Sequence, residues 1–168
     1  MIRLAVQADA HDVYRIYRER FEPLEPTSPS GLRVFQQKIE MAEPDFPLWV
    51  YESNERIEGW VSLGQVRNSP ALVKTMAEVS YYVSSGSRNL KIGTMLVEFA
   101  TKYASQETQL EWIHAYCGKS NSHAVSLWKN MGAQFIAEFP PVNRRPDREV
   151  IVQYSLPVTG QAEASDGA

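Results

Sequence analysis

Residues 77–100 constrain the fold most, because a strand-like pattern there passes through a polar turn directly into an amphipathic helix. The strand pattern, Thr75–Ser84, is rich in Val and Tyr, which strands favour. The turn, 85–91, has no apolar periodicity, whereas the apolar residues after it recur at helical spacing. A turn that opens a helix presents free backbone N–H groups and the positive end of the helix dipole. The segment therefore predicts an anion site suited to phosphate.

Two common phosphate motifs do not fit this segment. A Walker loop ends in Gly-Lys-Ser/Thr, and here Gly93 is followed directly by Thr94. A Rossmann fingerprint needs three glycines, and Gly86 and Gly93 supply two. The segment therefore indicates a different class of phosphate-binding fold.

The remaining periodicities predict a mixed α/β domain. The expected order is strand, two helices, three strands, helix, strand, helix and two strands, which lacks the regular alternation of a doubly wound sheet. Asp9 is expected to cap the first helix, and the short connection 54–56 predicts an antiparallel hairpin. The expected strands are 2–6, 47–53, 57–66, 75–84, 110–117, 134–138 and 149–156.

The bulk properties narrow the class of protein. The 168 residues suit one domain, expected at 1–156, and the small, polar residues 157–168 are expected to form a disordered tail. Lys and Arg total 17 against 20 Asp and Glu, so the net charge of -3 lacks the positive excess typical of nucleic-acid-binding proteins. No apolar run suits a signal peptide or a membrane span, which favours a cytoplasmic protein. No Cys/His cluster has zinc spacing, so no metal is expected.

Two motifs together resemble the GNAT superfamily of acetyltransferases. The turn fits the coenzyme A loop of that family, Arg/Gln-x-x-Gly-x-Gly/Ala, at Arg88 and Gly93, although Lys91 stands where the family usually has glycine. Residues 121–132 resemble the second signature, Asn-x-x-Ala/Ser-x-x-Leu-x-x-x-x-Gly, and the order of elements also matches. The resemblance implies a GNAT-like α/β (α+β) fold, with a mixed, mostly antiparallel twisted sheet of about seven strands and about four helices.

Within the superfamily, the chain is most similar to the phosphinothricin N-acetyltransferase-like group. The likeness lies in Glu78, Tyr82, Val83 and Ser84, and in the start of the chain, Ile2-Arg3-Leu4-Ala5. The resemblance implies an enzyme that transfers an acetyl group from acetyl-CoA, as co-substrate, to the primary amine of a small molecule of the amino acid or analogue type. It is also compatible with a homodimer, because dimers are common in the family.

The resemblance assigns the coenzyme A site residue by residue. Gly93 would let the backbone approach a pyrophosphate, and Arg88 would steady it by charge. The backbone of Tyr82 and Val83 would pair with the pantetheine arm, as an added strand does. Lys91 would either crowd the phosphate or direct its ammonium at it. The expected cofactor residues are Tyr82, Val83, Arg88, Asn89, Leu90, Lys91, Ile92, Gly93, Thr94 and Asn121, the last of which also suits a helix N-cap.

Glu78 is the candidate general base, because a carboxylate can take the proton that an amine loses when it attacks a thioester. The alternative is an ordinary strand-edge glutamate paired with a lysine. The general acid stays open, because Trp128 stands where many family members carry a tyrosine. His11 and His114 have no partner pattern and are read as structural residues. The other candidates for the acid are Tyr116, Tyr81, Tyr82, Cys117, His123 and solvent water.

The acceptor is left open by the sequence. Arg144, Arg145 and Arg148 lie in a loop before the last strand, where a basic loop would suit a substrate carboxylate or phosphinate. Residues 21–32 are the other expected side of the acceptor pocket. A rival hypothesis, motivated by Lys91 and Trp128, is a degenerate module that binds acyl-CoA or a protein partner without turnover.

Overall fold

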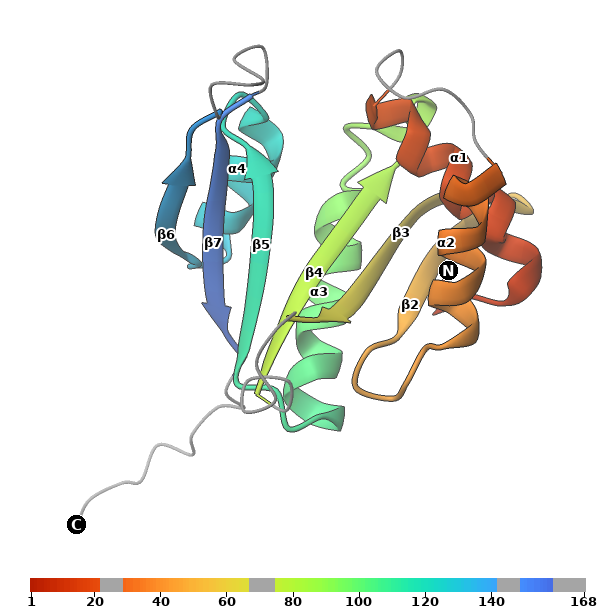
Figure 1. The fold of residues 1–168 in the computed structure, drawn as a ribbon, viewed down its shortest axis with the longest axis horizontal. Helices are drawn as coiled ribbons and strands as arrows, with labels where there is room; N and C mark the ends of the chain where they lie inside the picture. The colour runs from red at the N-terminus through yellow and green to blue at the C-terminus, as the bar shows by residue number, and fades with distance from the viewer. Residues whose placement is uncertain (22–28, 67–74, 142–148, 159–168) are drawn as a thin grey trace.

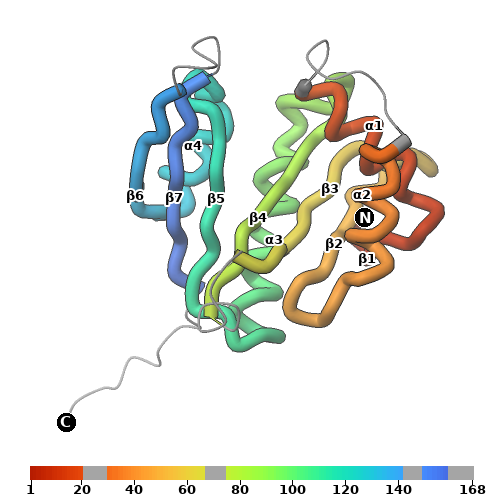
Figure 2. Tube along the Cα trace, viewed as in Figure 1, coloured from red at the N-terminus to blue at the C-terminus, as the bar shows by residue number. Residues whose placement is uncertain are grey.

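The computed structural model describes residues 1–21, 29–66, 75–141 and 149–158. Within them, seven strands form one sheet in the order β1-β2-β3-β4-β5-β7-β6 (Figures 1 and 2). The strands are β1 Ile2–Leu4, β2 Leu48–Ser53, β3 Arg56–Gln65, β4 Met76–Val83, β5 Trp112–Gly118, β6 Gln134–Phe139 and β7 Ile151–Pro157. The α-helices are α1 Ala10–Phe21, α2 Pro29–Glu40, α3 Ile92–Glu107 and α4 Ser122–Asn130, with short 3-10 helices at Gln7–Asp9 and Ser85–Ser87.

The expected fold class is confirmed in the described part of the chain. Strand pairing is antiparallel except between β4 and β5, which run parallel. A parallel pair needs a crossover connection, and α3 supplies it. The hairpin β2–β3 also forms, and Asn54 and Glu55 at its turn both have positive φ, 49° and 60°.

In the described structure, two α-helices pack on each face of the sheet. On the front face, which faces the viewer in Figure 1, α1 and α2 pack on β2 and β3 through a core centred on Trp60. On the back face, α3 and α4 join a larger core with Leu96 and Trp128 at its centre. Apolar burial of this kind is the main favourable term in folding, so each face of the sheet carries its own core.

The ends of several elements differ from the sequence-based expectation. The first strand ends at Leu4, and Asp9 is the last residue of a 3-10 helix that precedes α1. The Asp9 carboxylate accepts a hydrogen bond from the Val6 backbone N–H (2.8 Å) and pairs with Arg3 (2.7 Å). Asp9 therefore stabilises the 3-10 turn and anchors it to β1 instead of capping α1.

Two predicted helix ends are confirmed. The Asn121 side chain accepts a hydrogen bond from the Ala124 backbone N–H (3.2 Å) at the start of α4. Gly132, just after α4, has a φ of 80°, a left-handed conformation that glycine adopts without a steric penalty. These two residues mark the two ends of α4.

Several predictions fall outside the described residues. The loop with Arg144, Arg145 and Arg148, most of the connection 21–32 and most of the tail 157–168 belong to this group. In the part of the chain that the structure describes, no helix combines the length and apolar character that crossing a membrane would require.

Candidate active site

A cleft opens where β4 and β5 separate. The two strands pair from Met76 and Trp112 through Val79 and Ala115, and the ladder ends there. Beyond this point the carboxyl ends of the strands diverge, as Figure 1 shows. The cleft between them has a volume of about 1180 Å³, and its lining includes β4, β5, the N-terminal part of α3 and residues along the length of α4. Ligands of open α/β sheets bind at such carboxyl ends.

The backbone of β4 presents unpaired polar groups to this cleft. Ser84 donates its N–H to the Glu58 carbonyl of β3 (2.9 Å), and backbone groups of an antiparallel strand point alternately to its two neighbours. Tyr82 therefore pairs with β3, whereas Tyr81 and Val83 direct their N–H and C=O groups toward the gap. The backbone groups that face the gap thus belong to Tyr81 and Val83, whereas Tyr82 lines the cleft and directs its backbone to β3.

The N-terminus of α3 closes one end of the cleft. Lys91 is its N-cap with a φ of 59°, and Asn89 also has a positive φ of 67°. The first-turn residues Ile92, Gly93 and Thr94 line the cleft, and no acidic residue lies in this turn. Their backbone N–H groups have no acceptor within the helix. The turn is therefore suited to an anion, as the sequence predicts.

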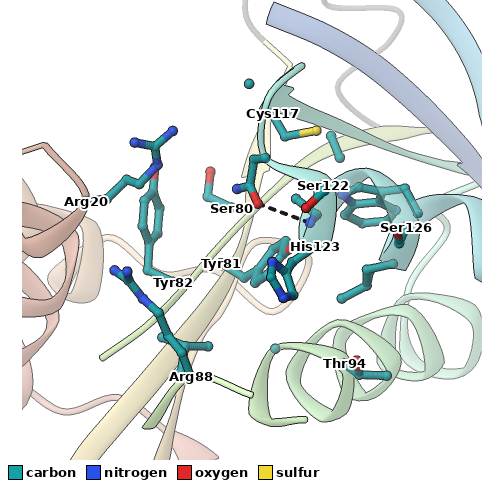
Figure 3. A pocket seen from close by; sticks show the side chains of 18 of the residues that line it. Arg20, Ser80, Tyr81, Tyr82, Arg88, Thr94, Cys117, Ser122, His123 and Ser126 are labelled. Atoms are coloured by element: carbon teal, nitrogen blue, oxygen red, sulfur yellow. Dashed lines mark hydrogen bonds between the residues drawn. The ribbon is translucent and has the colours of Figure 1, made fainter. Parts of the chain in front are cut away.

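The predicted cofactor residues gather here with one exception. Arg88 and Asn121 line the cleft together with the first turn of α3, although Arg88 lies on the opposite side from α4 (Figure 3). Leu90 does not line the cleft and is 64% exposed. Leu90 lies between two residues with positive φ, Asn89 and Lys91.

Gly93 has a packing role as well. A Cβ at this position would lie 3.2 Å from Cε2 of Tyr81 and 3.7 Å from Cγ2 of Val83. The missing side chain lets the start of α3 approach β4 closely. The distance between the helix N-terminus and the strand backbone that face the cleft depends on this contact.

Glu78 projects from the front face of β4 into the cleft. Its ladder neighbours are Gly64 on β3 and His114 on β5. Among the described residues, Glu78 makes no hydrogen bond or ion pair. Burial lowers the pKa of Lys38, and the charge of Glu78 partly opposes this shift. The alternative of a glutamate paired with a lysine is therefore not observed, and the carboxylate is available to a ligand.

The side-chain candidates for the general acid all line the cleft, but the environments of the three tyrosines and of the cysteine disfavour proton transfer. Burial raises the pKa of Tyr81 well above its usual range and that of Tyr82 to about 12. Burial also raises the pKa of Tyr116 and of the Cys117 thiol, with further contributions from Glu78 and Glu149 respectively. A thiolate with a pKa near that of free cysteine gains little from such weak acids.

Trp128 is buried, at 1% exposure, and its ring meets Tyr81 edge-on, with centroids 6.3 Å apart. Trp128 therefore supports the side of the cleft by packing, and its indole has no proton to offer a thiolate at neutral pH.

Two charged residues that the sequence did not single out also belong to the cleft. Arg20 of α1 and Glu149, just before β7, both line the cleft and form an ion pair of 3.2 Å. Figure 3 shows Arg20 beside Tyr82, across the cleft from Ser122 and Ser126 of α4. Arg20 and Glu149 are 129 positions apart in the chain, so no local sequence pattern could show that they meet.

The described residues contain no group of three or more His, Cys, Asp or Glu side chains placed to hold a metal ion. The described lining of the cleft includes backbone groups, the two carboxylates of Glu78 and Glu149, basic side chains and hydroxyl-bearing side chains.

Comparisons with known proteins agree with this architecture. The family model for the acetyltransferase (GNAT) family matches residues 10–133. A phosphinothricin acetyltransferase from Sinorhizobium meliloti, solved in complex with acetyl-CoA, aligns with a TM-score of 0.81 and 20% identity, covering 100% of this chain and 92% of that one. An N-acetyltransferase from Staphylococcus aureus aligns at 0.82 and 20%, covering 95% and 98%. No curated protein sequence matches the chain.

A ribosomal-protein-alanine N-acetyltransferase from Brucella melitensis is similar to the same degree, with a TM-score of 0.80, 22% identity and coverage of 94% and 99%. The family model spans most of the chain, and the divergent strands and open helix N-terminus agree with it. The chain belongs to the acetyltransferase (GNAT) family and is an acetyltransferase.

Proposed function

We propose that this enzyme transfers the acetyl group of acetyl-CoA to the primary amine of a small molecule of the amino acid or analogue type. The observation that carries the proposal is the divergence of β4 and β5, with unpaired strand backbone along the gap and the N-terminus of α3 at its end. This combination suits a ligand with an amide-bearing arm and a pyrophosphate.

The donor would bind along the gap. The backbone of Tyr81 and Val83 would pair with the amides of the pantetheine arm, and the first turn of α3 would hold the pyrophosphate with Arg88 and Lys91 nearby. An N–H of β4 near the point of divergence would polarise the thioester carbonyl. Asn121 contributes a polar side chain at the start of α4 while its oxygen caps that helix.

Glu78 would act as the general base. It is partly exposed to the cleft and has no partner among the described residues, so its carboxylate can accept a proton from the attacking amine, directly or through water. The C–N bond forms as the C–S bond breaks, the amine proton moves to Glu78, and the coenzyme A thiolate takes a proton from solvent.

A small acceptor is favoured by the composition of the acceptor end. Among the residues that the structure describes, Ile16, Arg20 and Tyr82 approach from one side and Tyr116 and Ile151 from the other. Within this described set, the end of the cleft offers the Arg20 guanidinium and several apolar surfaces. A carboxylate on the acceptor could exchange with Glu149 at the Arg20 guanidinium while its amine faces Glu78. The proposal includes a cytoplasmic location and a homodimer, and light scattering of the purified protein tests the second.

Titration calorimetry with acetyl-CoA, followed by a thiol-release assay with a panel of amino acids, amino acid amides, polyamines and peptides, tests the proposal. We expect micromolar binding, about -8 kcal/mol, and turnover that favours amines bearing a carboxylate. Glu78→Gln should retain binding and lose turnover by roughly 10²-fold or more. Binding with no turnover of any amine would instead support the degenerate module.

A further inference from the structure

Glu19 connects the last turn of α1 with the segment between β4 and α3. Its Oε2 accepts a hydrogen bond from the Ser85 backbone N–H over 2.6 Å, although the two residues are 66 positions apart in the chain. In Figure 1 the carboxyl end of α1 lies beside the carboxyl end of β4. A backbone N–H that donates to a carboxylate forms one of the stronger hydrogen bonds in a protein. The contact therefore holds α1 against the start of the turn that leads to Lys91 and α3.

The Glu19 carboxylate is itself held in place. Its Oε1 accepts a hydrogen bond from Nη1 of Arg15, one helical turn earlier (2.8 Å). Arg15 also donates from Nη2 to the Ile57 backbone carbonyl, near the start of β3 (3.1 Å). The Glu19 side chain is 21% exposed, so salt screens its contacts less than those of a fully exposed pair. Both oxygens of this carboxylate thus have a partner, and its position is fixed by α1 and β3.

The rest of the segment after β4 is held by β3. Ser84 donates its backbone N–H to the Glu58 carbonyl (2.9 Å), and the Ser87 hydroxyl donates to the Glu58 carboxylate (2.7 Å). The hydrogen bond from Ser85 to Glu19 differs from these, because it comes from α1. This helix also carries Arg20 into the cleft. Glu19 therefore joins a segment on the α3 side of the cleft to the helix that lines its other end.

Glu19 and Arg20 are consecutive residues with different surroundings. Arg20 lines the cleft and pairs with Glu149 (3.2 Å), whereas Glu19 lies outside the described lining and contacts Ser85. Consecutive residues of an α-helix point about 100° apart, so one turn can hold both contacts at once. A change in the position of Ser85 is therefore transmitted through Glu19 to the turn that carries Arg20.

We propose that Glu19 is a positioning residue that couples the binding of the acetyl donor to the binding of the acceptor. The inference rests on the proposed function, in which the turn before α3 holds the pyrophosphate and Arg20 meets the acceptor carboxylate. A donor that orders this turn also orders the last turn of α1 through Glu19, so less conformational entropy is lost when the acceptor binds. The two ligands then strengthen each other's binding by the same factor, as thermodynamic linkage requires.

Calorimetry with acetyl-CoA alone tests the donor side of the coupling. Glu19→Ala removes the acceptor of the Ser85 N–H, and acetyl-CoA should bind roughly threefold to tenfold more weakly, because the turn loses one charged hydrogen bond. Glu19→Gln keeps an oxygen that can accept from Ser85 and should retain most of the affinity. Asp12→Ala is the matched control, since it removes the exposed partner of Arg15 on the same helix (3.0 Å) and should leave the affinity unchanged.

Calorimetry with coenzyme A and the best amine of the substrate panel, a pair that cannot react, tests the coupling itself. The native enzyme should bind this amine at least about fivefold more tightly when it is saturated with coenzyme A. In Glu19→Ala this ratio of affinities should fall roughly threefold or more, and Glu19→Gln should restore it. A residue that only stabilises the fold would change the fraction of active protein and leave the ratio as it is.

The contact with Ser85 can be measured without any ligand. In amide hydrogen exchange followed by NMR, the Ser85 amide proton should exchange faster in Glu19→Ala than in the native protein. In Glu19→Gln it should exchange at close to the native rate. This readout reports the hydrogen bond directly and does not depend on activity.

The inference is overturned if Glu19→Ala binds acetyl-CoA with native affinity, if its ratio of amine affinities equals the native ratio, or if its Ser85 amide exchanges at the native rate. In each of these cases, turnover of an amine by the native enzyme would leave the proposed function standing. If the native protein binds neither acetyl-CoA nor any amine, the proposed function fails and the coupling fails with it. The exchange of Ser85 then still decides whether Glu19 holds the turn.

Discussion

Arg20 and Glu149 form an ion pair of 3.2 Å that connects α1 with the segment just before β7, on opposite sides of the cleft. Glu149 also accepts hydrogen bonds from the backbone N–H of Ser120 (3.0 Å) and from its hydroxyl. Gly118 leaves the space for this carboxylate, because a Cβ there would overlap it. The two sides of the divergent sheet are therefore linked at one charged residue.

Glu149→Gln should lower the free energy of unfolding by about 0.5–1 kcal/mol near pH 7, because it removes the charge from the hydrogen bonds with Ser120 and Arg20. The Ser120 hydroxyl, followed by its backbone N–H and Arg20, holds the pKa of Glu149 below 4.5. A lowered folded-state pKa contributes stability above the unfolded value, so the difference between native and variant should shrink as the pH falls below about 4.5. Urea unfolding of both proteins at several pH values measures this difference in the free energy of unfolding.

Glu138→Gln is the matched control, since Glu138 forms an exposed ion pair with Lys119 (2.8 Å) and holds no backbone N–H in the described structure. We expect Glu138→Gln to lower the free energy of unfolding by about 0–0.5 kcal/mol. If Glu149→Gln and Glu138→Gln changed the free energy of unfolding equally at pH 7, the contacts of Glu149 across the cleft would add nothing to stability.

Lys91→Gly should unfold at a higher denaturant concentration than Lys91→Ala. Lys91 has a φ of 59°, and a left-handed conformation costs a residue with a Cβ about 1 kcal/mol relative to glycine. Alanine removes the ammonium but keeps the Cβ, so the pair separates backbone strain from charge. A stability difference near zero between the two variants would contradict the strained conformation.

The same two variants test the role of the Lys91 ammonium. Lys91 is exposed and lines the cleft at the start of α3, so removal of its charge should weaken acetyl-CoA binding roughly twofold to fivefold in both variants. Calorimetry at low and high salt measures this, since the effect should fade as salt screens the charge. Tighter binding by Lys91→Gly would mean that the side chain obstructs the phosphate.

Gly93→Ala should change the free energy of unfolding by less than about 1 kcal/mol, because the better helix propensity of alanine offsets the contact with Tyr81. The Cβ would lie 3.2 Å from the Tyr81 ring, so the first turn of α3 must shift by a few tenths of an ångström. We expect a clear loss of acetyl-CoA affinity despite a nearly unchanged stability. Unaltered affinity by calorimetry would argue against a pyrophosphate at this turn.

Trp128→Ala should lower the free energy of unfolding by about 3–5 kcal/mol, because it empties a fully buried position next to Tyr81. Trp128→Phe keeps most of the apolar contact and should cost clearly less. Denaturant unfolding of both variants measures the difference. A loss below about 1 kcal/mol for the alanine variant would contradict a packing role.

Local sequence determined much of the fold. The apolar periodicities placed all four α-helices and all seven strands of the described residues in the correct order. Asn121 and Gly132 marked the ends of α4, because a side-chain cap and a left-handed glycine act within a few residues. The turn before α3 indicated the anion site for the same reason, since the free N–H groups belong to one continuous segment.

Residues that depend on strand register were harder to assign. The sequence identified a strand at 75–84, but it could not decide whether Tyr81 or Tyr82 directs its backbone to the cleft. A shift of one residue reverses every such direction, and the register is fixed by pairing with β3. The sequence likewise predicted a cap at Asp9, whose partners Val6 and Arg3 emerged from the packing of β1.

The sequence by itself determined the family, the order of elements and the strand, turn and helix that line the cleft. Only the tertiary structure decided that β4 and β5 separate after Val79, that His114 lies beside Glu78, and that Arg20 meets Glu149. The physical reason is the separation along the chain over which each kind of interaction acts. Caps, turns and amphipathic periods are set by neighbours within a few residues, whereas these contacts join segments 36 and 129 positions apart and arise when the two halves of the sheet pack together.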